Sequence, residues 1–157
     1  MKELRYEDVP KDWSVCWNDQ CPKANECLRR SAARLMPEKV KEHYSVAPGA
    51  WARGECELYV TNKPVRVVRG MKRLLDGVQW ASAVALRQDL YDVFGNYRRY
   101  YRYRDGQYDM GPDMQQQVAD VLRKHGYRGT PRFDEETEGF YFPDCKHDVL
   151  GSVTKRF

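Results

Sequence analysis

Apolar residues recur at helical spacing in four segments of the chain. The first segment covers residues 25–36, with Asn25 as a candidate N-cap and Pro37 directly after its last residue. Leu28 and Ala32 lie on its apolar face, about one helical turn apart. A stripe of this kind indicates a helix that buries one side and exposes the other to solvent.

The other three segments carry signals for where a helix begins or ends. A short helix is expected at residues 70–75, because an Asp-Gly pair follows and breaks the apolar pattern. The third helix is expected at 82–94, with Gly95 in the position that a helix-terminating glycine takes. The fourth, at 112–124, begins with a proline and ends in basic residues, as helices commonly do.

Between the third and fourth segments, four tyrosines and four arginines fill residues 97–104. Tyrosine favours strands, and the Asp-Gly pair at 105–106 is typical of a tight turn. We therefore expect residues 97–110 to form a β-hairpin. Further strands are expected at 57–60 and 138–142, so the predicted fold class is α+β, with about four helices packed against a small antiparallel sheet.

Length and composition are consistent with one domain of this class. The chain has 157 residues, 41% of them hydrophobic, which is enough for one core. We expect a single domain over residues 1–150, with a cysteine-rich N-terminal segment at 16–56, and a C-terminal tail at 151–157. The mean hydropathy is −0.83 and no apolar run is long enough for a membrane span or a signal peptide. The expected location is the cytoplasm.

The charge is divided along the chain more sharply than its net value of +4 suggests. Residues 63–104 hold ten basic and three acidic side chains, a balance of +7. Residues 105–148 hold ten acidic and five basic side chains, a balance of −5. Unless these two segments pack together and neutralise each other, the protein has a basic face and an acidic face.

Four of the five cysteines are grouped at positions that suit a metal site. The candidate zinc ligands are Cys16, Cys21, Cys27 and Cys56. Four thiolates suit a tetrahedral zinc ion, and grouped cysteines in a cytosolic chain are more often ligands or reactive groups than disulfides. The alternatives are an iron–sulfur cluster, whose ferredoxin spacings the chain does not match, and reduced cysteines that are simply buried. Cys145 and His147 form a second soft pair, which joins the group only if it folds back on it.

The tyrosine- and arginine-rich segment is a candidate surface for a polyanion. On a strand, one face presents three arginines about 7 Å apart, close to the phosphate spacing of a nucleic acid, and a tyrosine that can stack on a base. The candidate residues are Arg98, Tyr100, Arg102 and Arg104 on the strand, with Arg66, Arg69, Lys72 and Arg73 in the same basic segment. The alternative is that these arginines pair with the acidic segment downstream, including Glu135, Glu136 and Glu138, or with an acidic protein partner.

The sequence contains no motif of a known reaction, such as G-x-G-x-x-G, a P-loop, G-x-S-x-G or H-E-x-x-H. A binding protein is therefore favoured over an enzyme. The leading hypothesis is a zinc-stabilised protein that contacts nucleic acid or another polyanion through the basic strand. The alternatives are an adaptor that docks an acidic protein partner without a metal, and an enzyme with a reactive cysteine.

Several of these features occur together in a known family. They are Cys16, Cys21 and Cys27-Leu28-Arg29, then Gly70-Met71, Tyr100-Tyr101-Arg102-Tyr103-Arg104-Asp105-Gly106, Pro112-x-x-Gln115 and Phe133-Asp134. Over residues 15–142 the chain resembles an uncharacterised family of small cytosolic bacterial proteins, a domain of unknown function. The resemblance implies that the early cysteines and the arginine hairpin belong to the family pattern. It implies no activity.

Overall fold

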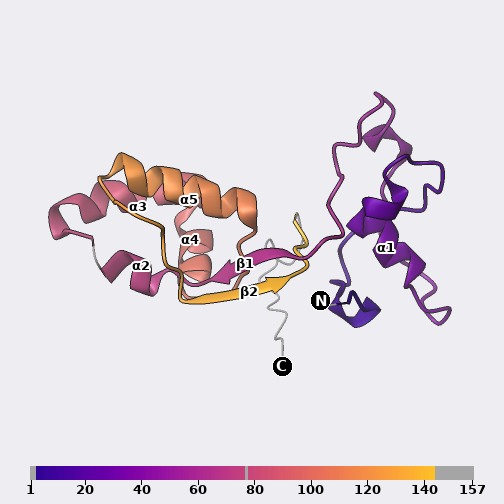
Figure 1. Cartoon of the computed structure of the whole chain (residues 1–157), viewed down its shortest axis with the longest axis horizontal. Helices are drawn as coiled ribbons and strands as arrows, with labels where there is room; N and C mark the ends of the chain where they lie inside the picture. The colour runs from indigo at the N-terminus through magenta and orange to yellow at the C-terminus, as the bar shows by residue number, and fades with distance from the viewer. Residues whose placement is uncertain (1–2, 77, 144–157) are drawn as a thin grey trace. The chain divides into compact units, whose positions relative to one another are not determined.

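The computed structural model describes residues 3–76 and 78–143 (Figure 1). The chain divides into two compact units, which are residues 1–64 together with the stretch from Phe142, and Val65–Tyr141. We call them the N-terminal unit and the C-terminal unit. The predicted domain end at residue 150 and the tail at 151–157 stay predictions, because they lie outside the described residues.

The N-terminal unit is built mainly from loops and single helical turns. Its described elements are α1 (Leu28–Arg34) and the 3-10 turns η1 (Tyr6–Asp8), η2 (Ala24–Glu26) and η3 (Pro48–Ala50). Isolated β-bridges join Val15 to Ser45 and Cys27 to Thr61. This unit therefore holds its backbone together with few ladder hydrogen bonds.

Side chains from distant segments close the core of the N-terminal unit. Trp13, Val15 and Leu28 are at most 1% exposed. The ring of Trp13 meets that of Phe142 edge to face, with 4.9 Å between the centroids. Its Nε1–H donates to the Pro143 carbonyl at 2.8 Å, so the buried indole keeps a hydrogen-bond partner.

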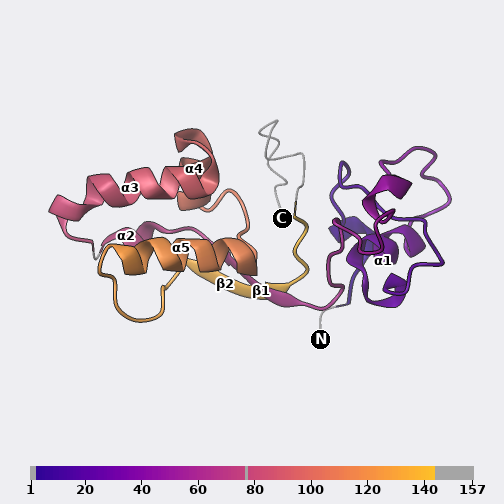
Figure 2. The ribbon, with the colours of Figure 1, turned by 90° about the horizontal axis from the view of Figure 1, so that it is seen from above.

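The C-terminal unit places helices beside a two-stranded antiparallel sheet (Figures 1 and 2). Strand β1 (Val65–Arg69) pairs with β2 (Glu135–Gly139), so that Val65 lies opposite Gly139. The helices between the strands are α2 (Lys72–Asp76), α3 (Trp80–Phe94), α4 (Tyr97–Arg104) and α5 (Pro112–Lys124). Helix α5 packs against β1 and α3, and α4 packs against α3. The predicted α+β class is confirmed.

The four helices predicted from apolar spacing are all present. Helices α3 and α5 agree closely with the predicted 82–94 and 112–124, and Gly95 ends α3 with a left-handed φ of 88°. Helix α1 is shorter than predicted, because its N-cap is Cys27 and Asn25 lies in η2. The short helix α2 begins two residues later than predicted.

The predicted β-hairpin at 97–110 is wrong, because residues 97–104 form helix α4. Asn96 is the N-cap of α4, and its side-chain oxygen accepts the backbone N–H of Arg99 at 3.0 Å. Tyr100 and Tyr103 lie three residues apart on the buried side, each 2% exposed, and the Tyr103 ring stacks on Phe94 at 4.8 Å. Burial of these rings outweighs the weaker strand preference of tyrosine.

The two other predicted strands fare differently. Residues 57–60 contain a turn and no strand. The strand predicted at 138–142 is β2, which begins three residues earlier. Part of the predicted hairpin return is also present, because Met110 forms an isolated antiparallel bridge with Val68 of β1.

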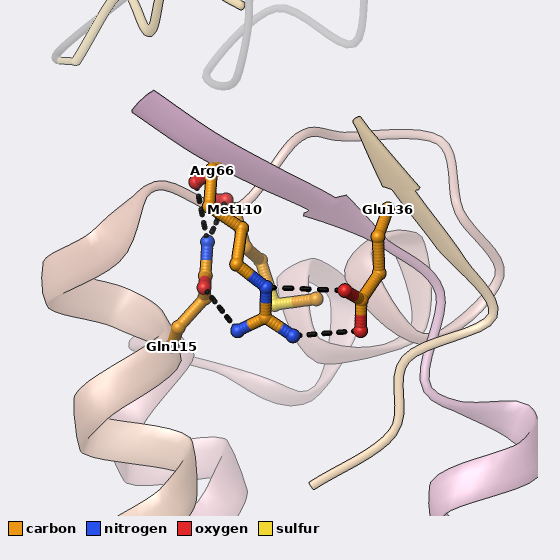
Figure 3. A network of polar contacts seen from close by, with 4 residues as sticks. All are labelled: Arg66, Met110, Gln115 and Glu136. Carbon is orange, nitrogen blue, oxygen red and sulfur yellow. Dashed lines mark hydrogen bonds and ion pairs between the residues drawn. The ribbon is translucent and has the colours of Figure 1, made fainter. Parts of the chain in front are cut away.

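A buried glutamine joins the sheet to the helices of the C-terminal unit (Figure 3). The Gln115 side chain, on α5, donates to the backbone carbonyls of Arg66 and Met110, both at 2.9 Å. Its Oε1 accepts Arg66 Nη1 at 3.0 Å. The same Arg66 guanidinium forms an ion pair with Glu136 of β2, with 2.6 Å between Arg66 Nη2 and Glu136 Oε1. The network thus ties both strands and α5 together.

A second polar contact fixes the start of α2. The Asp134 carboxylate accepts the backbone N–H groups of Lys72 at 3.0 Å and Arg73 at 2.8 Å. Gly70, with φ of 71°, lies against this carboxylate, and a Cβ at this position would clash with it. Asp134 therefore caps α2 from a distant part of the chain.

We predict that Gln115→Ala destabilises the C-terminal unit by about 2–4 kcal/mol, since it removes three hydrogen bonds and leaves buried groups without partners. Chemical unfolding of the purified variant measures the change. Gln116→Ala is the matched control, because Gln116 is exposed and bonds only to its helical neighbour Asp120 in the described contacts. Equal stability of the two variants would contradict the structural role of Gln115.

Candidate metal centre in the N-terminal unit

The four grouped cysteines line one pocket of about 500 Å³. They are Cys16, Cys21, Cys27 and Cys56, and all four are free thiols. Two of them are nearly covered, with Cys16 9% and Cys27 8% exposed, whereas Cys21 and Cys56 are half-buried. Residues separated by as many as 40 positions along the chain are thus brought to the same cavity.

Backbone hydrogen bonds hold two chain segments against the first turn of α1. Cys16 N–H donates to the Arg29 carbonyl at 3.0 Å, and Leu28 N–H donates to the Val60 carbonyl at 2.7 Å. The segment before the helix therefore brings Cys16 to this turn. Cys27 is the N-cap of the same helix.

Two cysteines begin tight turns. The Cys21 carbonyl accepts the N–H of Ala24 at 3.0 Å, and the Cys56 carbonyl accepts the N–H of Tyr59 at 3.3 Å. Each turn places its first residue at the wall of the pocket.

The buried side chain of Arg29 connects two of the segments that form the pocket. It is 3% exposed, and its Nε donates to the Leu58 carbonyl and its Nη1 to the Ser14 carbonyl, both at 2.8 Å. The guanidinium lies over the Trp13 ring, 4.3 Å from the centroid. One buried cation therefore connects the segments that carry Cys16 and Cys56.

The environment of Cys16 reflects the nearness of the other thiols. Burial raises the pKa of the Cys16 thiol above its usual value, while a backbone hydrogen bond from Asn18 opposes this effect. Charges on Cys27, Cys56 and Cys21 raise the same pKa further. Without a cation, burial and the three other thiols therefore disfavour the thiolate form of Cys16.

The sulfurs do not yet form a ready coordination set. Among residues 3–76 and 78–143, no group of three or more histidine, cysteine, aspartate or glutamate side chains is placed to hold a metal ion. Binding would require the thiols lining the pocket to move onto the ion. Cys145 and His147, which would join the group only if they folded back on it, lie outside the described residues.

The arginines predicted to bind a polyanion contact acids and a tyrosine of their own unit. Arg66 forms an ion pair with Glu136, and Arg69 forms one with Asp109. Arg104 pairs with Asp105 at 2.9 Å, and Lys72 lies 3.9 Å from the same carboxylate. Arg102 donates a hydrogen bond to the Tyr108 hydroxyl at 2.7 Å. The acids in these pairs, Glu136, Asp109 and Asp105, all belong to the acidic segment at 105–148. Arg73 and Arg98 are exposed, and Arg98 donates to the Tyr97 hydroxyl at 3.2 Å.

The predicted surface tyrosine is not on the surface. The prediction grouped Tyr100 with Arg98, Arg102 and Arg104 on one face of a strand, but the helix turns Tyr100 into the core. Its ring meets that of Tyr91 edge to face at 5.0 Å. No finding tests polyanion binding by the remaining arginines, which stays a prediction.

Sequence reasoning did not identify Arg29 and Arg30 as part of the site. Both are buried in α1 and line the pocket together with the cysteines. A signal was present, because these two arginines directly follow the apolar Cys27-Leu28 pair and precede Ala32 and Ala33 in the buried part of the helix.

Comparison with known proteins adds a family and no activity. A model described as "Family of unknown function (DUF6078)" matches residues 1–142, which confirms the predicted resemblance to an uncharacterised family. No curated protein and no solved structure matches the chain. In the described part of the chain, no helix is both long and apolar enough to cross a membrane.

We predict that Tyr100 ionises well above the ordinary pH range of tyrosine in the folded protein. Burial raises its pKa from 10 to about 12, so the stability it contributes is present below pH 10 and is lost as the pH rises to 12. The loss amounts to about 2–3 kcal/mol. Titration of tyrosinate absorbance should show this ionisation in the wild type and in Tyr97→Phe, where Tyr97 is 54% exposed, but not in Tyr100→Phe. Its persistence in Tyr100→Phe would refute the assignment.

Proposed function

We propose that this chain, which belongs to the DUF6078 family, is a binding protein whose N-terminal unit folds around a zinc ion held by four cysteines. The proposed ligands are Cys16, Cys21, Cys27 and Cys56. The observation that carries the proposal is their position as four free thiols around one pocket. Chain segments that are far apart in sequence would be joined through the ion.

The make-up of the N-terminal unit supports this proposal. Within residues 1–64 the described structure contains one α-helix of seven residues, and its other helical elements are single turns. A core formed by a unit below about 70–80 residues rarely supplies enough stability alone, and such units often add a metal or disulfides. The four thiols form no disulfide, so a bound metal ion is the cross-link that they can supply to this unit.

The chemistry of the pocket also suits zinc. Four thiolates bind zinc tetrahedrally at about 2.3 Å, and the ion favours the ionised form of each ligand. A bound ion would therefore oppose the effect of burial and of the neighbouring thiols, which raise the pKa of Cys16. In the metal-free chain the four sulfurs line the pocket without forming a coordination set, which is consistent with a site that metal binding completes. Free thiols and thiolate ligands persist in a reducing compartment, and we propose a cytoplasmic location on this basis.

The other functional hypotheses receive less support. An iron–sulfur cluster could use the same four cysteines, and its presence is an outcome of the test below. Contact with nucleic acid remains a proposal, but Arg66, Arg69 and Arg104 pair with acids of the chain and are less available to phosphates. Docking of an acidic protein partner by the exposed Arg73 and Arg98 likewise remains a proposal.

We predict that protein purified after zinc-supplemented expression contains one zinc per chain, measured by elemental analysis. Removal of the metal by a chelator should unfold the N-terminal unit, because binding free energy contributes to its folding. Trp13, which is buried in this unit, should then become exposed and shift its fluorescence to longer wavelength. Zinc and the original spectrum should return together on reconstitution.

Variants separate the four ligands from the fifth cysteine. Cys27→Ser should lose zinc, whereas the matched variant Cys145→Ser should retain one equivalent. Less than about a tenth of an equivalent of any metal in the wild type would overturn the proposal. Stoichiometric iron with sulfide in place of zinc would overturn the choice of metal.

A further inference from the structure

Arg30 stands in the wall of the cysteine pocket with two unused hydrogen-bond donors. The residue is 8% exposed and lines the pocket. Its Nη2 pairs with the Asp19 carboxylate, while Nε and Nη1 are buried and have no partner among the described residues. A buried donor without a partner is unfavourable, so an arginine in this state points to an acceptor that it meets in another state.

The neighbouring arginine does not share this feature. Arg29 uses its Nε and Nη1 on backbone carbonyls at 2.8 Å and has an aromatic ring beneath its guanidinium. Its role in joining chain segments is therefore accounted for. Arg30 adds a second buried positive charge to the same wall. Its guanidinium pairs with Asp19 and lies 6.0 Å from the centroid of the Trp17 ring, but its Nε and Nη1 have no acceptor among the described residues.

Helix geometry places Arg30 beside one of the cysteines. Cys27 is the N-cap of α1, with an extended backbone, and Arg30 follows three residues later in the first turn of the helix. Long side chains on a helix lean towards its N-terminus, where Cys27 lies. Both residues line the same pocket, so a short movement would bring the Cys27 sulfur and the Arg30 donors together.

Four thiolates around a divalent ion leave a net charge of −2. In a partly covered pocket, such a centre needs nearby cations and hydrogen-bond donors. Arginine remains protonated at all relevant pH values and offers its donors in a fixed fork. Thiolate sulfurs are the acceptors that four cysteines would provide.

We infer that Arg30 is the outer-shell donor of the metal centre: its Nε and Nη1 hydrogen-bond to cysteine sulfurs of a dianionic tetrathiolate site, while Asp19 anchors Nη2. This inference rests on the proposed metal binding. It specifies that the bound ion is a divalent cation and that all four of its ligands are thiolates. Arg30 is a positioning residue in this scheme and does not touch the ion.

The test is a comparison of Arg30→Met, Arg30→Lys and Arg34→Met in the full chain. Arg34 is the matched control, because it lies on the same helix, is exposed, and bonds to Asn25 at 2.9 Å. Competition with a chelating dye should give about 10–100-fold weaker zinc binding for Arg30→Met, the usual effect of losing an outer-shell partner. Arg30→Lys, which retains the charge and some donors, should fall between it and the wild type, and Arg34→Met should bind as the wild type does.

Cobalt substitution supplies a readout that a loss of packing alone would not change. Hydrogen bonds to thiolates lower the energy of the sulfur electrons, so their removal should move the thiolate-to-cobalt absorption to longer wavelength in Arg30→Met. Arg34→Met should keep the wild-type spectrum. Arg30→Lys provides the same spectral comparison should the methionine variant not fold.

The outcomes distinguish this inference from the proposed function. A wild-type protein that binds neither zinc nor cobalt would refute both the proposed metal site and the role of Arg30. A wild-type protein that binds zinc, with Arg30 variants of equal affinity and unchanged cobalt spectrum, removes the role of Arg30 and leaves the metal site intact.

Discussion

The buried guanidinium of Arg29 holds together the segments that form the cysteine pocket. A loop-rich unit must satisfy buried backbone carbonyls without a sheet, and this side chain satisfies those of Ser14 and Leu58. Each of these residues is two positions from a cysteine, Cys16 in the first case and Cys56 in the second, and Arg29 itself is two positions after Cys27. The approach of three thiols therefore depends on one hydrogen-bonded cation, before any metal is considered.

The C-terminal unit uses a buried amide in a comparable way. Gln115 bonds to two backbone carbonyls and receives a donor from Arg66, so that α5, β1 and the segment at Met110 share one network. Because the sheet has two strands in the described structure, its pairing alone gives limited stability. Polar contacts between elements supplement it, and Asp134 extends them to the start of α2.

Helices were predictable from sequence where apolar spacing and helix-ending residues agreed, as in α3, with Gly95 at its end, and in α5. The segment at 97–104 was not, because its tyrosines fit either an alternating strand or a helix. Contacts between elements decide the outcome: Tyr103 stacks on Phe94, and Tyr100 packs against Tyr91. Local preference contains no information on these partners. The Asn96 cap was a local signal that favoured the helix.

The cysteines of the candidate site were predictable from sequence, whereas its buried arginines were not. Cysteine spacing along the chain indicated the group at 16–56, since grouped thiols in one segment favour a common site. Arginines in a helix are usually assigned to solvent, because they are rarely buried without a partner. The burial of Arg29 depends on carbonyls fifteen or more residues away in sequence, which only the folded chain reveals.

The residues that suggested a family divide by their roles in the structure. In the C-terminal unit, Gly70, Tyr103, Gln115 and Asp134 each have a structural partner that accounts for them: a close approach, a stacked ring, two carbonyls, or the start of a helix. In the N-terminal unit, Arg29 is accounted for in the same way. The thiols of Cys16, Cys21 and Cys27 differ, because they share a pocket wall with Cys56 and with Arg30, whose Nε and Nη1 lack partners in the described structure. Packing explains the first group of residues, whereas the proposed metal centre would account for the second group by drawing thiolates and a guanidinium to one ion.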